Sequence, residues 1–176
     1  MKSSIALIGF MGVGKTTVGK VLAKRLNRKF VETDSLIEQQ VGKPIAEIFQ
    51  QDGEVAFREL EIEVTKKVAE NKNQIIACGG GIVLNKINID RLKKDSVIVC
   101  LTASPKVILE RVSGDGGERP ILKASNKAGK IQELLRFRQP FYERAADIKI
   151  DTSKLDINSV VEGIINQVKR DENFDL

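Results

Sequence analysis

The chain of 176 residues is 41% hydrophobic, enough to bury a core without disulfides or metal clusters. Its 29 basic and 24 acidic residues give a net charge of +5, which suits an anionic ligand but excludes the strongly basic surface of a nucleic-acid-binding protein. No segment approaches the ~18 consecutive apolar residues of a membrane span, and the N-terminus does not resemble a signal peptide, so we expect a soluble cytoplasmic protein that binds no membrane.

Strand-like and helix-like segments alternate along the chain, as a parallel sheet covered by helices requires. Apolar runs predict five strands, near residues 4–9, 29–33, 74–78, 96–101 and 147–151. Helical periodicity and capping residues predict helices near 15–26, 35–41, 53–71, 104–112, 130–145 and 156–170. The predicted fold is a single α/β domain over residues 1–176, with three layers (α/β/α) around a five-stranded parallel sheet, and we expect a monomer.

The first predicted strand leads into a phosphate-binding loop. Residues 9–16 read Gly-Phe-Met-Gly-Val-Gly-Lys-Thr and fill every fixed position of the Gly-x4-Gly-Lys-Ser/Thr motif. In such a loop backbone N–H groups surround the β-phosphate, Lys15 reaches the β- and γ-phosphates, and the Thr16 hydroxyl coordinates Mg²⁺. The alternative is a glycine-rich turn that matches by chance, but the flanking strand and helix disfavour it. The loop therefore predicts nucleotide binding.

A carboxylate follows the second predicted strand, at the sheet edge where ligands of such folds bind. Asp34 is the candidate for chemistry there. It could instead be a turn or cap residue, because Ser35 and Glu38 have the spacing of a capping box. Taken alone, the residue does not decide between the two.

The third helix and the third strand each add a candidate. Arg58 and Glu61 lie three residues apart on the helix, although they could simply form an exposed salt bridge, with Glu54 as a further partner. Gly79–Gly81 directly follow an apolar strand, and three consecutive glycines indicate close approach of the backbone to a ligand. A plain flexible turn is the alternative for the glycines.

Residues 113–129 carry four glycines and many polar side chains with little apolar periodicity. They predict a surface loop about as long as active-site lids, with a disordered insertion as the alternative. Arg119 lies inside this segment, and Arg138 lies on the helix that follows.

Histidine is absent, so a general base must be a carboxylate or, failing that, a lysine, a cysteine or the single tyrosine, Tyr142. Cys78 and Cys100 each lie in an apolar run without a partner at metal-ligand spacing. We expect both to be reduced thiols in the core.

In this order, these residues resemble the shikimate kinases, and the resemblance covers nearly the whole chain. Many NTPases share the phosphate loop, whereas the combination of Asp34, Phe57-Arg58-x-x-Glu61 and the triple glycine is far more specific. Further matches are Gly19, residues 45–49, Gly53-Glu54, Arg119-Pro120, and Arg138 with Pro140 and Tyr142.

The resemblance implies transfer of the γ-phosphate of ATP to the 3-hydroxyl of shikimate, on the nucleoside-monophosphate-kinase-like variant of the P-loop NTPase fold. The residues that would bind ATP are Gly12, Val13, Gly14, Lys15, Thr16, Thr17, Arg111 and Arg119. Those that would bind shikimate are Asp34, Arg58, Gly79, Gly80, Gly81 and Arg138. A helical segment over about 33–61 would carry part of this site, and residues about 113–129 would form the lid.

The same resemblance implies individual roles. Arg58 and Arg138 would hold the shikimate carboxylate, and Glu61 would hold Arg58 in place from behind. Asp34 would accept hydrogen bonds from ring hydroxyls and take the proton as the oxygen attacks. The residues implied to be catalytic are Lys15, Asp34 and Arg119. Arg111 would stack on the adenine, unless it is only a solvated residue of a helix surface.

Magnesium is the cofactor that the resemblance implies, held by Thr16 and, through water, by Glu32. The family usually has Asp at the position of Glu32, so the longer side chain puts the geometry of this contact in doubt. The segment before Arg119 also looks slightly longer than usual, which leaves the alignment of the lid open by one residue.

Three other functions stay open. One, a nucleic-acid ATPase, is disfavoured by the modest net charge and the absence of aromatic platforms. Another small-metabolite P-loop kinase, such as one for gluconate or a nucleoside, should lack the combination of Asp34, Arg58, the triple glycine and Arg138. A catalytically silent kinase-like regulatory module should have lost the loop lysine, the Thr16 hydroxyl or the base, and all three are present.

Overall fold

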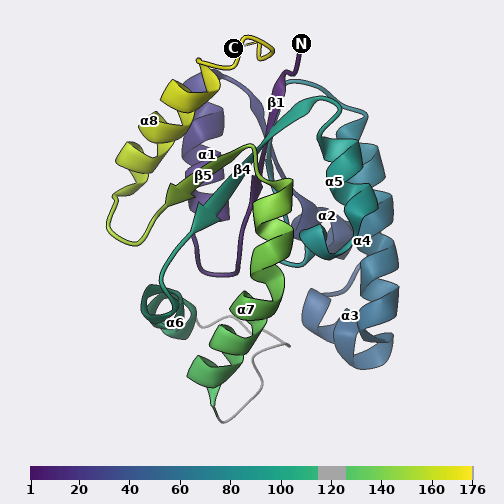
Figure 1. Ribbon diagram of the computed structural model, residues 1–176. Helices are drawn as coiled ribbons and strands as arrows, with labels where there is room; N and C mark the ends of the chain where they lie inside the picture. Colours follow the sequence, from purple (N-terminus) through teal and green to yellow (C-terminus); the bar gives the residue numbers. More distant parts are fainter. Residues whose placement is uncertain (115–125, 176) are drawn as a thin grey trace.

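A five-stranded parallel sheet forms the centre of the computed structural model, which describes residues 1–114 and 126–175 (Figure 1). Its strands lie in the order β2-β3-β1-β4-β5. They span β1 Ser4–Ile8, β2 Lys29–Glu32, β3 Gln74–Ala77, β4 Ser96–Thr102 and β5 Ile148–Asp151. The five predicted strands and the fold class are confirmed, with bounds that differ by one residue at most.

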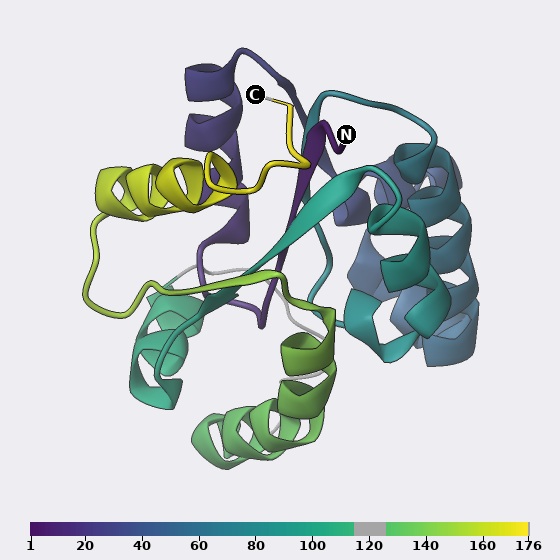
Figure 2. The same ribbon diagram turned by 45° about the horizontal axis from the view of Figure 1, so that its top comes forward.

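Helices cover both faces of this sheet. On one side lie α1 and α8, and on the other lie α4, α5 and α7 (Figures 1 and 2). The helices span α1 Lys15–Leu26, α2 Thr33–Val41, α3 Ile45–Gln51, α4 Gly53–Ala69, α5 Lys86–Leu92, α6 Pro105–Gly114, α7 Lys127–Ala145 and α8 Ile157–Val168, with a 3-10 turn η1 at Ile82–Leu84. As predicted, Asp156 caps α8, and its carboxylate accepts the Ser159 N–H at 3.0 Å.

The burial of each strand follows its place in the sheet. All five residues of β1 and six of seven in β4 are buried, because helices cover both of their faces. The edge strands β2 and β5 have only one buried residue each. The central strands are therefore continuous apolar runs in the sequence because both of their faces are buried.

The sheet register brings the candidate residues to one edge. Leu7 of β1 and Glu32 of β2 both pair with Ala77 of β3. Two residues beyond this row, the chain reaches Gly9 of the phosphate loop, Asp34 and Gly79. Because the strands are parallel, all three residues follow the carboxyl ends of strands and lie at the same end of the sheet.

Three short elements were not predicted from the sequence: α3, η1 and α5. Neither α3 nor α5 has a side-chain cap from its own N-cap residue, so neither carries a local start signal. Instead, the Glu38 carboxylate on α2 accepts the N–H of Ile45, the first residue of α3, at 2.9 Å. Tertiary contacts thus start this helix, and no single-segment pattern reports them.

Two helix starts also differ from the predictions. Helix α2 begins at Thr33, directly after β2, rather than at 35. The alternative of a capping box formed by Ser35 and Glu38 does not hold, because Ser35 donates to Glu32 at 2.9 Å. Helix α7 begins at 127, where Asn126 caps it by accepting the Gly129 N–H. Of the predicted loop 113–129, the two ends are therefore helical, and residues 115–125 lie outside the described residues.

Candidate active site

The phosphate loop connects β1 to α1 with three glycines at positive φ: Gly9 at 141°, Gly12 at 78° and Gly14 at 102°. A Cβ at Gly9 would lie 2.3 Å from the Leu101 carbonyl oxygen, so only glycine fits. The Lys15 ammonium donates to the carbonyls of Gly9 and Phe10, both at 2.8 Å. Its charge is therefore held across the mouth of the loop, where phosphates would approach the helix N-terminus.

The next two residues of the predicted ATP site also line this region. Thr16 and Thr17 open helix α1 and border a cavity of about 470 Å³ together with Gly12, Gly14 and Lys15. Val13 turns its side chain into the core, where it is 1% exposed. Its contribution to a phosphate site is therefore restricted to its backbone.

Glu32, which stands where the resemblance leads us to expect aspartate, lies within reach of the Thr16 hydroxyl. Its carboxylate accepts hydrogen bonds from the Thr16 hydroxyl and, at 2.9 Å, from Ser35. The Ser35 contact on the far side pins the longer side chain, so the carboxylate still faces Thr16.

This pair fits a magnesium ion that a nucleotide brings with it. The described residues contain no cluster of three or more His, Cys, Asp or Glu side chains able to hold a metal by themselves. Magnesium at phosphate sites typically keeps waters and needs only one or two protein oxygens beside the phosphates. The Thr16 hydroxyl and the Glu32 carboxylate supply that number.

Asp34 lies on the first turn of α2, beside the triple glycine. Its side chain is half-buried, and the buried Oδ1 has no hydrogen-bond partner among the described residues. Burial raises the pKa of Asp34 above its ordinary value, while the positive charges of Lys15 and Arg58 oppose the rise. A Cβ on Gly79 would lie 2.4 Å from Oδ1, so the glycine is what allows this carboxylate to sit there.

Arg58 and Glu61 form a pair inside the cavity rather than on the surface. Glu61 is fully buried and accepts from Arg58 Nη1 at 3.1 Å, and Glu54 accepts from Arg58 Nη2 at 3.1 Å. The guanidinium packs on the Gly81 backbone, where a Cβ would lie 2.3 Å from Nη1. Burial raises the pKa of Glu61 to about 7 despite the opposing charge of Arg58.

The triple glycine forms a turn after β3 whose N–H groups are not equivalent. Gly79 donates its N–H to the Thr33 hydroxyl at 2.9 Å. Within the described part of the chain, the N–H groups of Gly80 and Gly81 have no such acceptor. Gly79 therefore contributes the space for Asp34, and the two following residues keep donors for a ligand.

Arg138 reaches the same cavity from α7, far away in the sequence. It is 3% exposed, its guanidinium lies 5.7 Å from the centre of the Phe10 ring, and its Nε has no partner among the described residues. A charged side chain with open hydrogen-bonding capacity in a buried position is typical of a ligand site.

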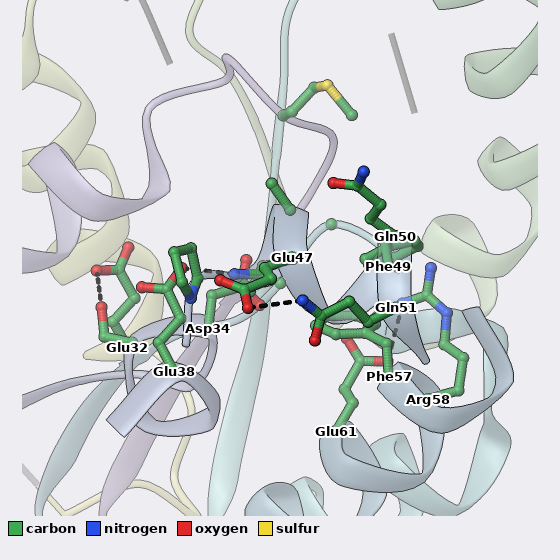
Figure 3. A pocket seen from close by; sticks show the side chains of 18 of the residues that line it. Glu32, Asp34, Glu38, Glu47, Phe49, Gln50, Gln51, Phe57, Arg58 and Glu61 are labelled. Atoms are coloured by element: carbon green, nitrogen blue, oxygen red, sulfur yellow. Dashed lines mark hydrogen bonds and ion pairs between the residues drawn. The ribbon is translucent and has the colours of Figure 1, made fainter. Parts of the chain in front are cut away.

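These groups line a cavity of about 870 Å³. In Figure 3 the acidic groups Asp34 and Glu61 and the Arg58 guanidinium surround it, with Glu38, Glu47 and Phe49 from the α2 and α3 side. This cavity and the 470 Å³ cavity at the phosphate loop share Glu32 and Asp34, as well as Met11, Gly79 and Gly80. Asp34 thus lies where a phosphate donor and a second substrate would meet.

The two arginines predicted for ATP have different outcomes. Arg111 on α6 is not a solvated surface residue: it donates to the Gly12 carbonyl at 3.2 Å, the Thr152 hydroxyl at 3.0 Å and the Thr152 carbonyl at 2.8 Å. It thereby joins the phosphate loop to the segment after β5 and borders the 470 Å³ cavity. Arg119 lies outside the described residues, so its role stays a prediction.

The cysteine and tyrosine side chains named above as alternative general bases are protonated near neutral pH. Burial raises the pKa of Cys78 far above its ordinary value and that of Cys100 to about 11, and both thiols are free and buried as expected. Tyr142 is buried and donates its hydroxyl to the Gly80 carbonyl at 2.5 Å. The contacts of Tyr142 with Gly80 and of Thr33 with Gly79 were not predicted from the sequence. The available signal was proximity, because Tyr142 lies one helical turn after Arg138 and Thr33 directly precedes Asp34.

Comparisons of sequence and of structure with known proteins agree on one family. A profile of the shikimate kinase family matches residues 11–169. The chain is 48% identical over 170 residues to a shikimate kinase of Thermodesulfovibrio yellowstonii, covering 97% of each protein, and 47% identical over 162 residues to one of Caldanaerobacter subterraneus, covering 92% of this chain and 94% of that protein. Its structure is similar to that of shikimate kinase from Acinetobacter baumannii in complex with shikimate, with a TM-score of 0.93, 33% identity, and coverage of 98% of this chain and 96% of that chain. On this match of sequence and structure over nearly its full length, the chain belongs to the shikimate kinase family.

Proposed function

We propose that the protein transfers the γ-phosphate of ATP to the 3-hydroxyl of shikimate, giving shikimate 3-phosphate and ADP. The observation that carries this proposal is the junction of the two cavities at Asp34, with the phosphate-loop lysine on one side and two arginines on the other. An acidic polyol needs cationic donors at its carboxylate and an acceptor at its hydroxyls, and this is the set of groups that the larger cavity offers.

In the proposed mechanism the side chains position shikimate and move one proton. Arg58 and Arg138 bind the carboxylate, and Glu61 keeps the Arg58 guanidinium directed into the cavity. Asp34 accepts the proton of the 3-hydroxyl on its unpartnered Oδ1 as that oxygen attacks. Its raised pKa makes it a stronger base than an ordinary aspartate. The N–H groups of Gly80 and Gly81 contact the substrate as well.

On the nucleotide side, Lys15 and the backbone N–H groups of Gly12, Val13, Gly14, Thr16 and Thr17 bind phosphates. Thr16 and, through water, Glu32 would hold Mg²⁺, which would supply positive charge to the phosphate oxygens. Arg111 stacks on the adenine and Arg119 meets the transferring phosphate, roles that depend on the family resemblance.

Other parts of the proposal concern the whole protein. Residues about 33–61 form the substrate-binding segment and about 113–129 the lid of a single-domain monomer that binds neither nucleic acid nor a membrane and works in the cytoplasm. No helix within residues 1–114 and 126–175 is long and apolar enough to cross a bilayer. The two buried free thiols support a reducing compartment.

The proposal is tested by mixing the purified protein and Mg-ATP with shikimate, gluconate or a nucleoside in parallel and measuring ADP release. We expect release that depends on both shikimate and Mg²⁺. Turnover of gluconate or a nucleoside without turnover of shikimate would favour another metabolite kinase. Nucleotide binding without turnover of any acceptor would favour the silent regulatory module.

A further inference from the structure

The triple-glycine turn is held by two buried hydroxyl groups from different elements. Thr33 of α2, which is fully buried, accepts the Gly79 N–H at 2.9 Å. Tyr142 of α7, 6% exposed, donates its hydroxyl to the Gly80 carbonyl at 2.5 Å. The turn therefore has one anchor on each side.

The Tyr142 contact determines where a neighbouring N–H points. In a trans peptide the carbonyl oxygen and the N–H of the following residue lie in one plane and point in opposite directions, and the described residues contain no cis peptide. A hydrogen bond that draws the Gly80 carbonyl toward Tyr142 therefore directs the Gly81 N–H the opposite way. The Arg58 guanidinium packs against the same Gly81.

This peptide needs such an anchor because of its two flanking residues. Gly80 and Gly81 have no side chains, so the plane between them can rotate over a range that other residues forbid. Tyr142 lies one helical turn after Arg138, whose Nη1 would be 3.6 Å from a Cβ on Gly80. One helix thus carries both a proposed substrate ligand and the group that orients the backbone next to it.

We infer that Tyr142 is a positioning residue for substrate binding, with Thr33 as its counterpart. Its hydroxyl fixes the Gly80–Gly81 peptide so that the Gly81 N–H joins Arg58 and Arg138 as a donor to the substrate anion. Burial raises the pKa of Tyr142 well above its usual value, so the hydroxyl stays a donor throughout the working pH range. The inference depends on the shikimate contacts proposed above for Gly81 and Arg138.

The test removes one oxygen atom with Tyr142→Phe. We expect the KM and the Kd for shikimate to rise about tenfold, while the KM for ATP stays within about twofold and kcat falls less than the KM rises. The amide signal of Gly81 in ¹⁵N-labelled protein should move in the variant and respond less to added shikimate. Ser4→Ala is the matched control, because it removes a buried hydroxyl that donates to Asp95 at 3.0 Å, at the opposite end of the sheet.

An unchanged shikimate KM and an unmoved Gly81 signal in a folded Tyr142→Phe protein would overturn the inference, as would an equal loss in Ser4→Ala. If Tyr142→Phe does not fold, Thr33→Val provides the test through the other anchor, and Thr33→Ser, which keeps the hydroxyl, should restore binding. Equal shikimate binding by the Thr33→Val and Thr33→Ser variants would also contradict it. Arg138→Lys is measured beside them. If it leaves the shikimate KM unchanged, the proposed carboxylate site itself fails. If Arg138→Lys raises the shikimate KM and Tyr142→Phe does not, only the role of Tyr142 is overturned.

Discussion

The phosphate loop and the substrate cavity are built in different ways, although they meet at Asp34. The loop is one run of eight residues whose lysine is held by carbonyls of the same loop. The substrate cavity is assembled from α2, α3, α4, the turn after β3 and α7. A local site depends on backbone conformation within one segment, whereas an assembled site depends on sheet register and helix packing.

The two regions also differ in how completely their polar groups are satisfied. Three buried atoms of the substrate cavity have no partner among the described residues: Asp34 Oδ1, Glu61 Oε2 and Arg138 Nε. Buried unpaired polar groups are destabilising, by about 1–3 kcal/mol each. Their concentration in one cavity is typical of a ligand-binding site.

The largest expected effect comes from the local site. Lys15→Met should lower kcat about 10²–10³-fold, because a preplaced charge at the transferring phosphate contributes about 3–4 kcal/mol to the transition state. Steady-state ADP release at saturating shikimate measures it. Lys24→Met, an exposed lysine later on α1, is the matched control and should keep full activity. Comparable kcat values for the two variants would show that the charge of Lys15 does not contribute to catalysis.

The second effect concerns the junction of the two regions. Asp34→Asn should lower kcat about 10²-fold or more, because the amide cannot accept the hydroxyl proton. The melting temperature should not fall, since the substitution removes the cost of burying an ionisable carboxyl without a partner at Oδ1. Asp90→Asn, at an exposed ion pair with Lys86, is the control. A merely capping role of Asp34 would show itself as near-normal turnover of the Asn variant.

The third effect isolates the assembled site. Arg138→Lys should raise the shikimate KM about tenfold with a smaller change in kcat, because an ammonium group cannot reproduce the planar donor fork of a guanidinium. Arg136→Lys, two residues earlier on the same helix and exposed, should leave both constants unchanged. Equal KM values in the wild type and the Arg138 variant would exclude Arg138 from carboxylate binding.

The contrast between the two regions also explains how far the sequence could be interpreted. The phosphate loop, the five strands and the fold class follow from periodicity and one motif. Asp34 and Arg58 taken singly were compatible with a cap and a surface salt bridge, and only the family resemblance joined them. The anchors at Thr33 and Tyr142 could not be predicted, because each hydroxyl meets a turn that is distant in sequence. Helix α3 escaped for the same reason, since Glu38 of another helix starts it.

The smallest expected effect is a change in the pH dependence of stability, caused by Glu61. The pKa of Glu61 in the folded protein, about 7, lies above the ordinary glutamate value of 4.5, so the folded state binds more protons than the unfolded state between these two values. The stabilisation from this group is therefore fully present below about pH 4.5 and is lost as the pH rises through 7. Glu61→Gln cannot titrate and should lack this loss.

Melting temperatures of the wild type and Glu61→Gln between pH 4.5 and 8 test this sign. Since the substitution also removes the ion pair with Arg58, the absolute melting temperature of the variant does not decide the matter. The difference, variant minus wild type, should rise by several degrees from pH 4.5 to 7, as about 1 kcal/mol corresponds to ~2–4 °C in a domain of this size. Glu59→Gln, an exposed position on the same helix, should give a constant difference over that interval. A difference that stays constant or falls for Glu61→Gln would mean that this buried carboxylate is ionised throughout, held by Arg58, and that the assembled site carries its charges as fixed pairs.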